Sequence, residues 1–332
     1  MYINREHSID YFMDSKYSPD FLFIIADIDG KRVHKLLEEF PDARYIEVKY
    51  SVSQETGGEL IDSFVTRTNF PHSINGKVYC SLYQDLKEFV EEINQISRSI
   101  VVDISELHLR FLGAFLAMLP VAKWEHLFAA YAEPEAYVRS LEKEPDLSAQ
   151  NDTLGRIGGF DLNSSFWGYE EIPNLKTITS ERNQYIWIAF LGFEGKRATA
   201  VYAEIADDSS LTIPVITMPS IKPGWAATAF EANQALFDNA RINCQSVKYI
   251  NALDPYAAYN LIEQIHKAHP QKHIVMSPLG TRPVSLGVLL YAMLHEESEV
   301  YFDTPKRACS IIKKAGKIHI YDLLSFYNAV KE

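Results

Sequence analysis

The segment Ser277–Arg282 (Ser-Pro-Leu-Gly-Thr-Arg) combines residue types that suit the binding of an anion. It separates an apolar run that predicts a strand from a segment beginning at Pro283 that predicts a helix. Backbone amides at a helix amino terminus and the helix dipole both favour negative charge. The hydroxyl of Thr281 can cap the helix or donate to a phosphate, and Arg282 can clamp a phosphate through two hydrogen bonds. We therefore expect a ligand site lined by Ser277, Gly280, Thr281 and Arg282.

A second loop of the same kind is Gly192–Gly195 (Gly-Phe-Glu-Gly). It follows an apolar run and precedes a predicted helix, where glycines let the backbone approach a ligand and leave amides free to bind it. Its spacing is not Gly-x-Gly-x-x-Gly, so it does not indicate a dinucleotide-binding motif. We include Gly192, Glu194 and Gly195 in the predicted site. For both loops the alternative is a strand-to-helix turn that binds nothing.

Carboxylates in the first half of the chain offer acid–base chemistry. Asp103 lies at the end of a predicted strand, residues 99–104, and Glu133 follows another, residues 126–131. Two carboxylates at adjacent strand ends can act as an acid–base pair or hold a metal. Asp103, Glu133 and Glu194 are therefore the catalytic candidates. The alternative is that such side chains cap helices or lie solvated in loops.

The elements that must position these residues alternate between apolar runs and helical segments. In the second half, the predicted strands are 185–193, 211–218, 247–251, 273–276 and 300–302, and the predicted helices are 196–205, 224–238, 254–268 and 283–296. The first half alternates in the same way, with predicted strands at 21–26, 45–48, 99–104 and 126–131 and predicted helices at 31–40, 85–96 and 107–119. This alternation predicts an α/β protein with two Rossmann-like halves and mostly parallel, doubly wound sheets, whose ligands bind beyond the carboxyl ends of the strands. Pro214 suggests an edge strand or an irregularity in the strand that contains it.

Residues 144–176 differ from their flanks, because they are rich in Asn, Asp, Ser, Gly and Pro and show little periodicity. We therefore predict three parts. These are an α/β domain at residues 1–145, an irregular linking segment at 146–180, and a Rossmann-like ligand-binding domain at 181–332.

The composition excludes several classes of protein. The chain has 332 residues, 47% of them hydrophobic, which is enough for two globular domains. A net charge of −12 argues against general nucleic-acid binding and against anionic membranes. The three cysteines and ten histidines show no metal-ligand spacing, so we expect mostly buried, reduced thiols and neither a metal nor a cofactor. The amino terminus does not resemble a signal peptide and no run spans a bilayer, so we expect a soluble, cytoplasmic protein.

The strand–Ser-Pro-Leu-Gly-Thr-Arg-Pro–helix pattern resembles the late strand–loop–helix motif of CRISPR-associated Rossmann fold (CARF) sensor domains. In that family a Thr/Gly-rich loop, often followed by a basic residue, meets a cyclic oligoadenylate on the two-fold axis of a homodimer. The resemblance covers the second half of the chain and implies a pocket lined by residues of both loops. The usual double glycine is replaced by Pro278-Leu279-Gly280, and no effector or winged-helix motif is evident.

The run Phe21–Gly30 resembles the first motif of haloacid-dehalogenase-type phosphatases, an apolar strand followed by Asp27-x-Asp29-Gly. The resemblance implies a nucleophile at Asp27, an acid/base at Asp29 and Mg²⁺ held by the pair. Lys31 stands where the family has Thr or Val, and the acidic pair expected later in the chain is not found after a strand. A phosphatase is therefore not the leading hypothesis.

Three functional hypotheses follow from the sequence. The first is a sensor that recognises a nucleotide-type anion and signals through a homodimer or a partner protein, with prokaryotic antiviral defence as its setting. The second is an enzyme that acts on nucleotides or phosphosugars by glycosidic or phosphoribosyl chemistry. The third is a structural subunit of a larger complex.

Overall fold

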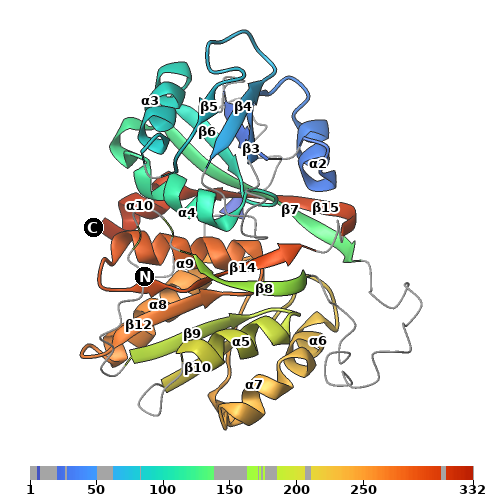
Figure 1. Ribbon diagram of the computed structural model, residues 1–332, viewed down its shortest axis with the longest axis vertical. Coiled ribbons are helices and arrows are strands. Elements are labelled where there is room, and N and C mark those ends of the chain that lie inside the picture. The colour runs from blue at the N-terminus through green and yellow to red at the C-terminus, as the bar shows by residue number, and fades with distance from the viewer. Residues whose placement is uncertain are drawn as a thin grey trace. The chain divides into compact units, whose positions relative to one another are not determined.

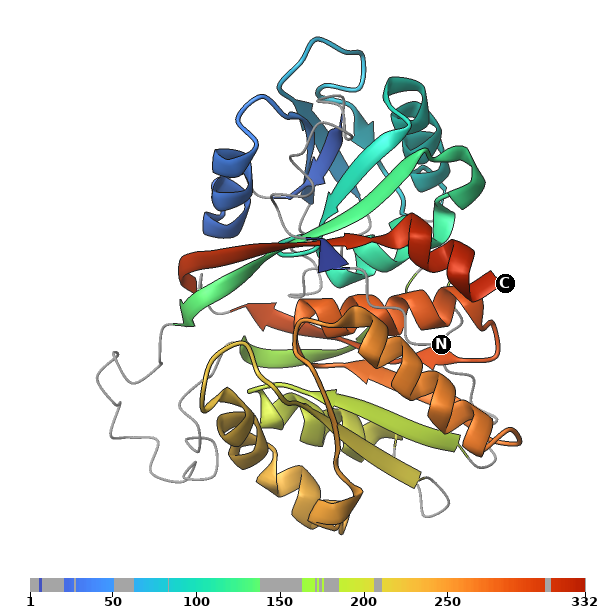
Figure 2. The same cartoon turned by 180° about the vertical axis from the view of Figure 1, so that it is seen from behind.

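The computed structural model describes residues 6–7, 21–26, 28–50, 63–82, 84–137, 163–170, 172, 175, 185–205, 211–307 and 312–331. The chain divides into two compact units. Unit 1 comprises Met1–Tyr137 and Ile312–Glu332, and unit 2 comprises Val138–Ile311. Figures 1 and 2 show the elements of both units from opposite sides. Each unit has a sheet flanked by helices, so the predicted α/β class with two Rossmann-like halves is confirmed.

Unit 1 is built on an eight-stranded sheet with the order β1-β15-β7-β6-β2-β3-β4-β5. The four central strands are parallel: β7 (His126–Tyr137), β6 (Ser99–Asp103), β2 (Leu22–Ile25) and β3 (Arg44–Tyr50). Antiparallel strands extend both sides, namely β4 (Phe64–Thr68), β5 (Val78–Tyr79), β15 (Ile312–Asp322) and β1 (Glu6–His7). The chain steps from β2 to β3 in one direction and then returns to β6 and β7 on the other side of β2. This reversal makes a topological switch point between β2 and β6.

The carboxyl terminus of the chain belongs to unit 1, which corrects the predicted domain at residues 181–332. Strand β15 pairs with β7 from Ile312, opposite Tyr137, to Asp322, opposite Phe128. Helix α10 (Leu323–Lys331) follows directly. No strand or helix was predicted after residue 302, so β15 and α10 were both missed. Even a recognised strand pattern does not identify its partner, because pairing depends on contacts far apart in sequence. The pattern therefore could not show that the last strand returns to the first unit.

Helices cover both faces of the unit 1 sheet (Figure 1). Helix α2 (Lys31–Glu39) buries Val33 and Leu36 against strand residues that include Phe23, Val101 and Phe128. Helices α3 (Leu86–Ile96) and α4 (Leu109–Met118) pack together, and a short 3-10 helix, Val121–Lys123, follows them. An aromatic cluster joins these helices to the strands, with ring centroids 4.6–6.2 Å apart among Phe64, Tyr79, Phe89, Phe111 and Phe115.

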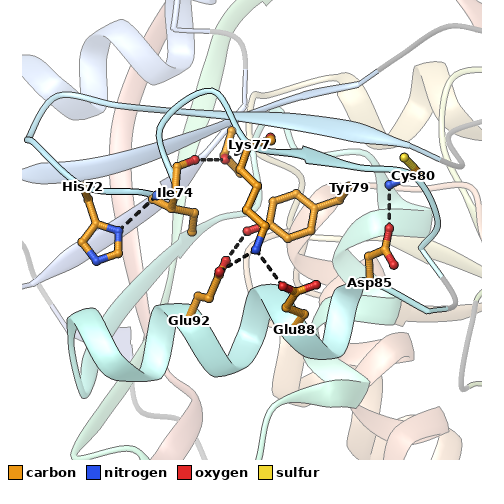
Figure 3. Close-up of polar contacts among 9 residues, drawn as sticks. His72, Ile74, Lys77, Tyr79, Cys80, Asp85, Glu88 and Glu92 are labelled. Carbon is orange, nitrogen blue, oxygen red and sulfur yellow. Dashed lines mark hydrogen bonds and ion pairs between the residues drawn. The ribbon is translucent and has the colours of Figure 1, made fainter.

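Charged side chains fix the β4–β5 hairpin to α3 (Figure 3). Lys77 Nζ lies 2.8 Å from Glu88 Oε1 and 2.6 Å from Glu92 Oε1. The same ammonium lies 5.1 Å from the ring centroid of Tyr79, whose hydroxyl donates to Glu92. Burial, followed by the hydrogen bond to Glu92, raises the pKa of Tyr79, so the hydroxyl remains a donor at neutral pH.

Two predictions concern the burial of the cysteines and the crossing of a membrane. Cys80 is a free and exposed thiol, an exception to the expectation of mostly buried, reduced cysteines. It follows the short edge strand β5, where the apolar pattern ends. The side chains of Cys244 and Cys309 lie outside the described residues. Among the helices that are described, none has the length and apolar character needed to cross a membrane.

Unit 2 contains a five-stranded sheet with the order β11-β10-β9-β12-β13, in which every pair is parallel. The strands are β9 (Tyr185–Leu191), β10 (Leu211–Thr217), β11 (Lys248–Ile250), β12 (His273–Pro278) and β13 (Glu299–Val300). From β9 the chain moves outward to β10 and β11, then crosses back to β12 and β13 on the other side of β9. This is the predicted doubly wound arrangement, and its switch point lies between β9 and β12.

The helices of unit 2 close to the predicted positions are α5 (Gly195–Ile205), α8 (Pro255–Ala268) and α9 (Arg282–Leu294). The Asp254 carboxylate caps α8, because it accepts hydrogen bonds from the amides of Tyr256 and Ala257. The single helix predicted at 224–238 is instead two helices, α6 (Trp225–Ala232) and α7 (Gln234–Asn239), which meet at Asn233. A 3-10 helix, Cys244–Ser246, precedes β11.

Of the two alternatives expected at Pro214, the edge strand is wrong, because β10 lies between β9 and β11; the irregularity lies in the pairing with β11. Pro214 is opposite Ala189 on β9. On the other side, pairing with the three-residue strand β11 starts only at Val215, opposite Lys248. The proline is tolerated inside the sheet because the short neighbouring strand does not reach it.

The segment predicted as irregular contains a strand. Strand β8 (Asn163–Glu170) pairs antiparallel with β14 (Phe302–Arg307) and forms a two-stranded ribbon in unit 2. This corrects the prediction for 146–180 over the eight residues of β8. The partner strand lies more than 130 residues later in the chain, so the local composition could not reveal it.

Candidate functional site

The two predicted loops of unit 2 meet at the switch point of its sheet. Gly192 follows β9, and Leu279 and Gly280 follow the adjacent strand β12. A Cβ atom added to Gly192 would lie 2.6 Å from the carbonyl oxygen of Leu279. A Cβ atom added to Gly280 would lie 3.4 Å from the carbonyl oxygen of Phe190. The backbones of the two loops therefore touch, and glycine at position 192 is required for that contact.

Gly195 has a different role from the one predicted for it. It is buried, and a Cβ atom there would lie 1.6 Å from the carbonyl oxygen of Ala232. The start of α5 thus packs directly on the junction of α6 and α7. The buried side chain of Asn233 fixes this junction, because its Nδ2 donates to the carbonyls of Gly192 (2.8 Å) and Ala229 (2.7 Å). The sequence signal for this junction was the asparagine within the predicted helix 224–238, and it was missed.

Ser277 and Thr281 both use their hydroxyls within the protein. Ser277 is completely buried, and its Oγ accepts a 2.9 Å hydrogen bond from Trp187 Nε1. Its side chain therefore stabilises the core beneath the loops and is not at the surface of the site. Thr281 occupies the N-cap position of α9, but its hydroxyl donates to the carbonyl of Ala252 at 2.7 Å and makes no side-chain cap. It links the loop after β12 to the loop after β11.

The partly exposed residues at this edge are Gly192, Glu194, Gly280, Thr281 and Arg282. Arg282 is the first residue of α9, and the first helical hydrogen bond runs from Ser285 N to Thr281 O at 2.9 Å. Pro283 has no amide hydrogen, so within the first turn the amides of Arg282 and Val284 are the donors without an acceptor inside the helix, the kind of group that binds anions at helix starts. Glu194 is neutralised by Arg197, whose Nη1 lies 2.5 Å from its carboxylate, so it does not repel such a ligand strongly.

An aromatic pair borders the Gly192–Gly195 loop. Phe193 lies in the loop itself and packs edge-to-face on Trp225, the first residue of α6, with ring centroids 5.4 Å apart. Both side chains are partly exposed. Flat rings beside this loop would suit a ligand that carries a base, because bases stack on aromatic side chains. Trp225 was not among the predicted site residues, although it stands directly after a glycine at the start of a predicted helix.

Unit 1 has a second candidate site at its own switch point. Asp103 ends β6 and is only 1% exposed. Its Oδ1 accepts from the amide of Ser105 at 3.0 Å, while Oδ2 has no hydrogen-bond partner among the described residues. Burial raises the pKa of Asp103 to about 6, although the hydrogen bonds from Ser105 act in the opposite direction. A buried carboxyl group with such a pKa suits proton transfer near neutral pH.

Other charged side chains are buried near the same strand ends. Arg32, in the first turn of α2, donates from Nε to Glu106 Oε1 at 2.6 Å, and the two side chains are 8% and 14% exposed. Both residues act electrostatically on Asp103. Glu47 on β3 is 2% exposed and accepts from the amide of Ile28 at 2.9 Å. The sequence analysis missed these residues, because a charged residue in a predicted helix or strand is normally assigned to the surface.

The predicted carboxylates do not form one group. Glu133 lies within β7 and not in a loop, and its Oε2 is 3.4 Å from His319 Nε2 on β15. Asp103 is instead bonded to the turn after β6. Glu194 belongs to unit 2. For the phosphatase motif, Asp29 is exposed, and Asp27 lies outside the described residues.

Comparisons with known proteins do not assign the chain to a family. No protein-family model matches it, and no curated protein matches it. One similar solved structure is described as a ketoreductase domain from the bacillaene assembly line, with 10% sequence identity and a TM-score of 0.20. The alignment covers 83% of this chain and 65% of that one. At this TM-score the likeness carries no argument about function.

Proposed function

We propose that unit 2 binds a nucleotide-type anion in the crevice lined by Gly192, Glu194, Gly280, Thr281 and Arg282, and that it acts as a ligand sensor. The observation that supports this most directly is the strand order β11-β10-β9-β12-β13. It brings two loops, 85 or more residues apart in sequence, to the switch point where open α/β sheets bind their ligands.

The chemistry of the crevice fits a phosphorylated ligand with a base. The amides at the start of α9 and the Arg282 guanidinium suit the phosphate. The Phe193–Trp225 pair offers a stacking surface for the base. A ligand that moves Thr281 would act on its hydrogen bond to Ala252, and hence on the loop that starts α8. This gives a sensor a route from the ligand to a second helix.

The setting of this sensor follows from the resemblance to CARF domains. It is a cytoplasmic homodimer, or a subunit with a partner protein, in prokaryotic antiviral defence. A cyclic oligonucleotide is the ligand that this resemblance implies.

The test is mass spectrometry of small molecules released from the purified full chain, followed by calorimetric titration with the nucleotide found or with a cyclic oligoadenylate. We expect wild-type protein and Lys272→Ala, a control at the other end of β12, to bind equally. We expect Arg282→Ala to bind at least tenfold more weakly, since it loses a charge-assisted contact worth about 1.5–3 kcal/mol. Binding by Arg282→Ala that equals wild type would show that the crevice is not the site.

The buried carboxyl group of unit 1 favours a second function, an enzyme that acts on nucleotides or phosphosugars with Asp103 as the acid–base group. Its support is the combination of a buried, unbonded Oδ2 and a pKa of about 6. Turnover of nucleosides or phosphosugars by wild type that is lost in Asp103→Asn, with folding retained, would establish it. Equal turnover in both proteins would exclude Asp103 from catalysis.

A further inference from the structure

Ionisable side chains gather where α8 and α9 end, at the edge of the unit 2 sheet opposite the ligand crevice. Glu263 and His266 lie one turn apart on α8. His295 is the C-cap residue of α9, and its carbonyl accepts hydrogen bonds from both the amide and the hydroxyl of Ser298. These bonds fix the turn that carries Glu297.

Close packing of the two helices holds these side chains together. A Cβ atom on Gly287 of α9 would lie 2.0 Å from the carbonyl oxygen of Pro255 on α8. The sequence analysis had no reason to connect Glu263 and His266 with His295, because they lie about 30 residues apart on separate helices.

The distances within this cluster suit a metal ion. One ligand atom from each of Glu263, His266 and His295 lies within 4.8 Å of the others. His295 Nε2 lies 3.6 Å from Glu263 Oε2. Metal–ligand bonds of about 2.1 Å in a tetrahedral site place ligand atoms about 3.4 Å apart. Only a small movement of side chains is therefore needed to surround an ion.

We propose that Glu263, His266 and His295 bind one divalent transition-metal ion, and that Zn²⁺ is the type it suits. Two imidazoles and a carboxylate form a ligand set that borderline metals prefer over Mg²⁺ or Ca²⁺. The three side chains are 20–25% exposed, so the ion can enter and a water molecule can complete its coordination.

Glu297 completes the arrangement from outside the ligand set. Its Oε1 lies 3.3 Å from His295 Nδ1 and can accept a hydrogen bond from that ring nitrogen, which faces away from Glu263. Metal-binding histidines commonly donate their second N–H to a carboxylate, which sets the tautomer and the ring orientation. With both imidazoles neutral, the two carboxylates also balance the charge of a divalent ion.

Two tyrosines hold the imidazoles in place without a metal. The Tyr291 ring stacks on His295 with centroids 4.0 Å apart, and its hydroxyl lies 2.6 Å from His266 Nδ1. The Tyr259 hydroxyl lies 3.2 Å from His295 Nε2, the atom that would bind the ion. Metal binding would break this last hydrogen bond, so Tyr259 competes with the ion.

The test uses the full chain, with Co²⁺ as a spectroscopic probe and Zn²⁺ as its competitor. We expect one Co²⁺ per chain, with the visible absorption of a four-coordinate site, displaced by Zn²⁺. The double variant His266→Gln/His295→Gln should lose this absorption, while His269→Gln, at the end of the same helix, should keep it. Circular dichroism checks that each variant is folded. Absence of a saturable one-to-one signal in wild type, or an equal signal in the double variant, would overturn the proposal.

Single substitutions separate the metal site from a purely structural hydrogen-bond network. Glu297→Gln should weaken Zn²⁺ binding by about 10–100-fold, the usual effect of losing the carboxylate that orients a ligand. Tyr259→Phe should bind Zn²⁺ as tightly as wild type or more tightly, because it removes the competing hydroxyl. Unchanged affinity in Glu297→Gln together with weaker binding in Tyr259→Phe would contradict the assigned roles.

Discussion

The switch points of the two sheets are surrounded by different types of residue. In unit 1, the ends of β2 and β6 are surrounded by buried charged side chains, chiefly Asp103, Arg32 and Glu106. In unit 2, the ends of β9 and β12 are surrounded by glycines and helix-start amides, and the hydroxyls there are already bonded within the protein. The same topology therefore gives one site suited to moving protons and one suited to holding an anion.

The largest effect is expected from breaking the ion pair of unit 1. Arg32→Met should lower the free energy of unfolding by about 3 kcal/mol, because it removes the positive charge that is paired with the largely buried Glu106 carboxylate. Urea unfolding followed by circular dichroism measures this loss. Lys35→Met on the same helix, which removes an exposed ion pair with Glu39, should cost less than about 1 kcal/mol. Equal losses in both variants would mean that burial does not distinguish the unit 1 site.

In unit 2 the sensitive positions should be glycines. Gly195→Ala should lower the free energy of unfolding by about 3 kcal/mol or more, because its Cβ atom meets the backbone carbonyl of Ala232, which cannot easily move. Gly280→Ala is the matched control, since its nearest contact of 3.4 Å leaves room for a methyl group. A Gly195→Ala protein as stable as the control would refute the packing of α5 on the α6–α7 junction.

The stability of unit 1 should depend on pH through the buried carboxyl group of Asp103. Its pKa is raised to about 6 in the folded protein and is near 3.9 in the unfolded chain. As the pH rises from about 4 to about 6, the unfolded chain loses its proton first, so this group lowers stability across that window. Asp103→Asn removes the penalty and should be more stable than wild type above pH 6, by on the order of 3 kcal/mol at most. Urea titrations at several pH values measure it, and parallel curves for the two proteins would contradict the raised pKa.

The smallest effect is expected at the link between two loops of unit 2. Thr281→Val removes the hydrogen bond to Ala252 and should cost about 1 kcal/mol of stability. Ligand binding should be affected more than folding if this bond couples the crevice to α8. Calorimetry and urea unfolding on the same variant separate the two effects. Thr281→Ser, which keeps the hydroxyl, should restore both.

Much of the fold could be predicted from the sequence, because unit 2 alternates apolar strands with helices that carry clear start signals. The helix expected from residue 254 is α8, which begins at Pro255 after the Asp254 cap, and the helix expected from Pro283 is α9. The pairing of β15 with β7 could not be predicted, because strand patterns do not encode partners far away in the chain.

The position of the candidate site could be predicted in part, because loops that follow predicted strands can be found from local sequence. Gly192 and Gly280 were identified in this way, and the structure brings them together. The roles of Ser277 and Gly195 depend on neighbours at Trp187 and Ala232, which only the folded chain brings near. Arg32 was missed because burial of a charge depends on its ion-pair partner, 74 residues later.

The pairing of Ile312 with Tyr137 has a consequence for biosynthesis. Unit 2 is inserted between two neighbouring strands of unit 1, so a ribosome completes unit 2 before it makes β15. At translation rates of about 5–20 residues per second, β7 waits roughly 10–40 seconds for the strand that pairs with it. During that interval the nascent chain presents an unpaired strand edge, which other polypeptides can join. Unit 1 is therefore the part of this protein whose yield should depend most on chaperones that shield nascent chains.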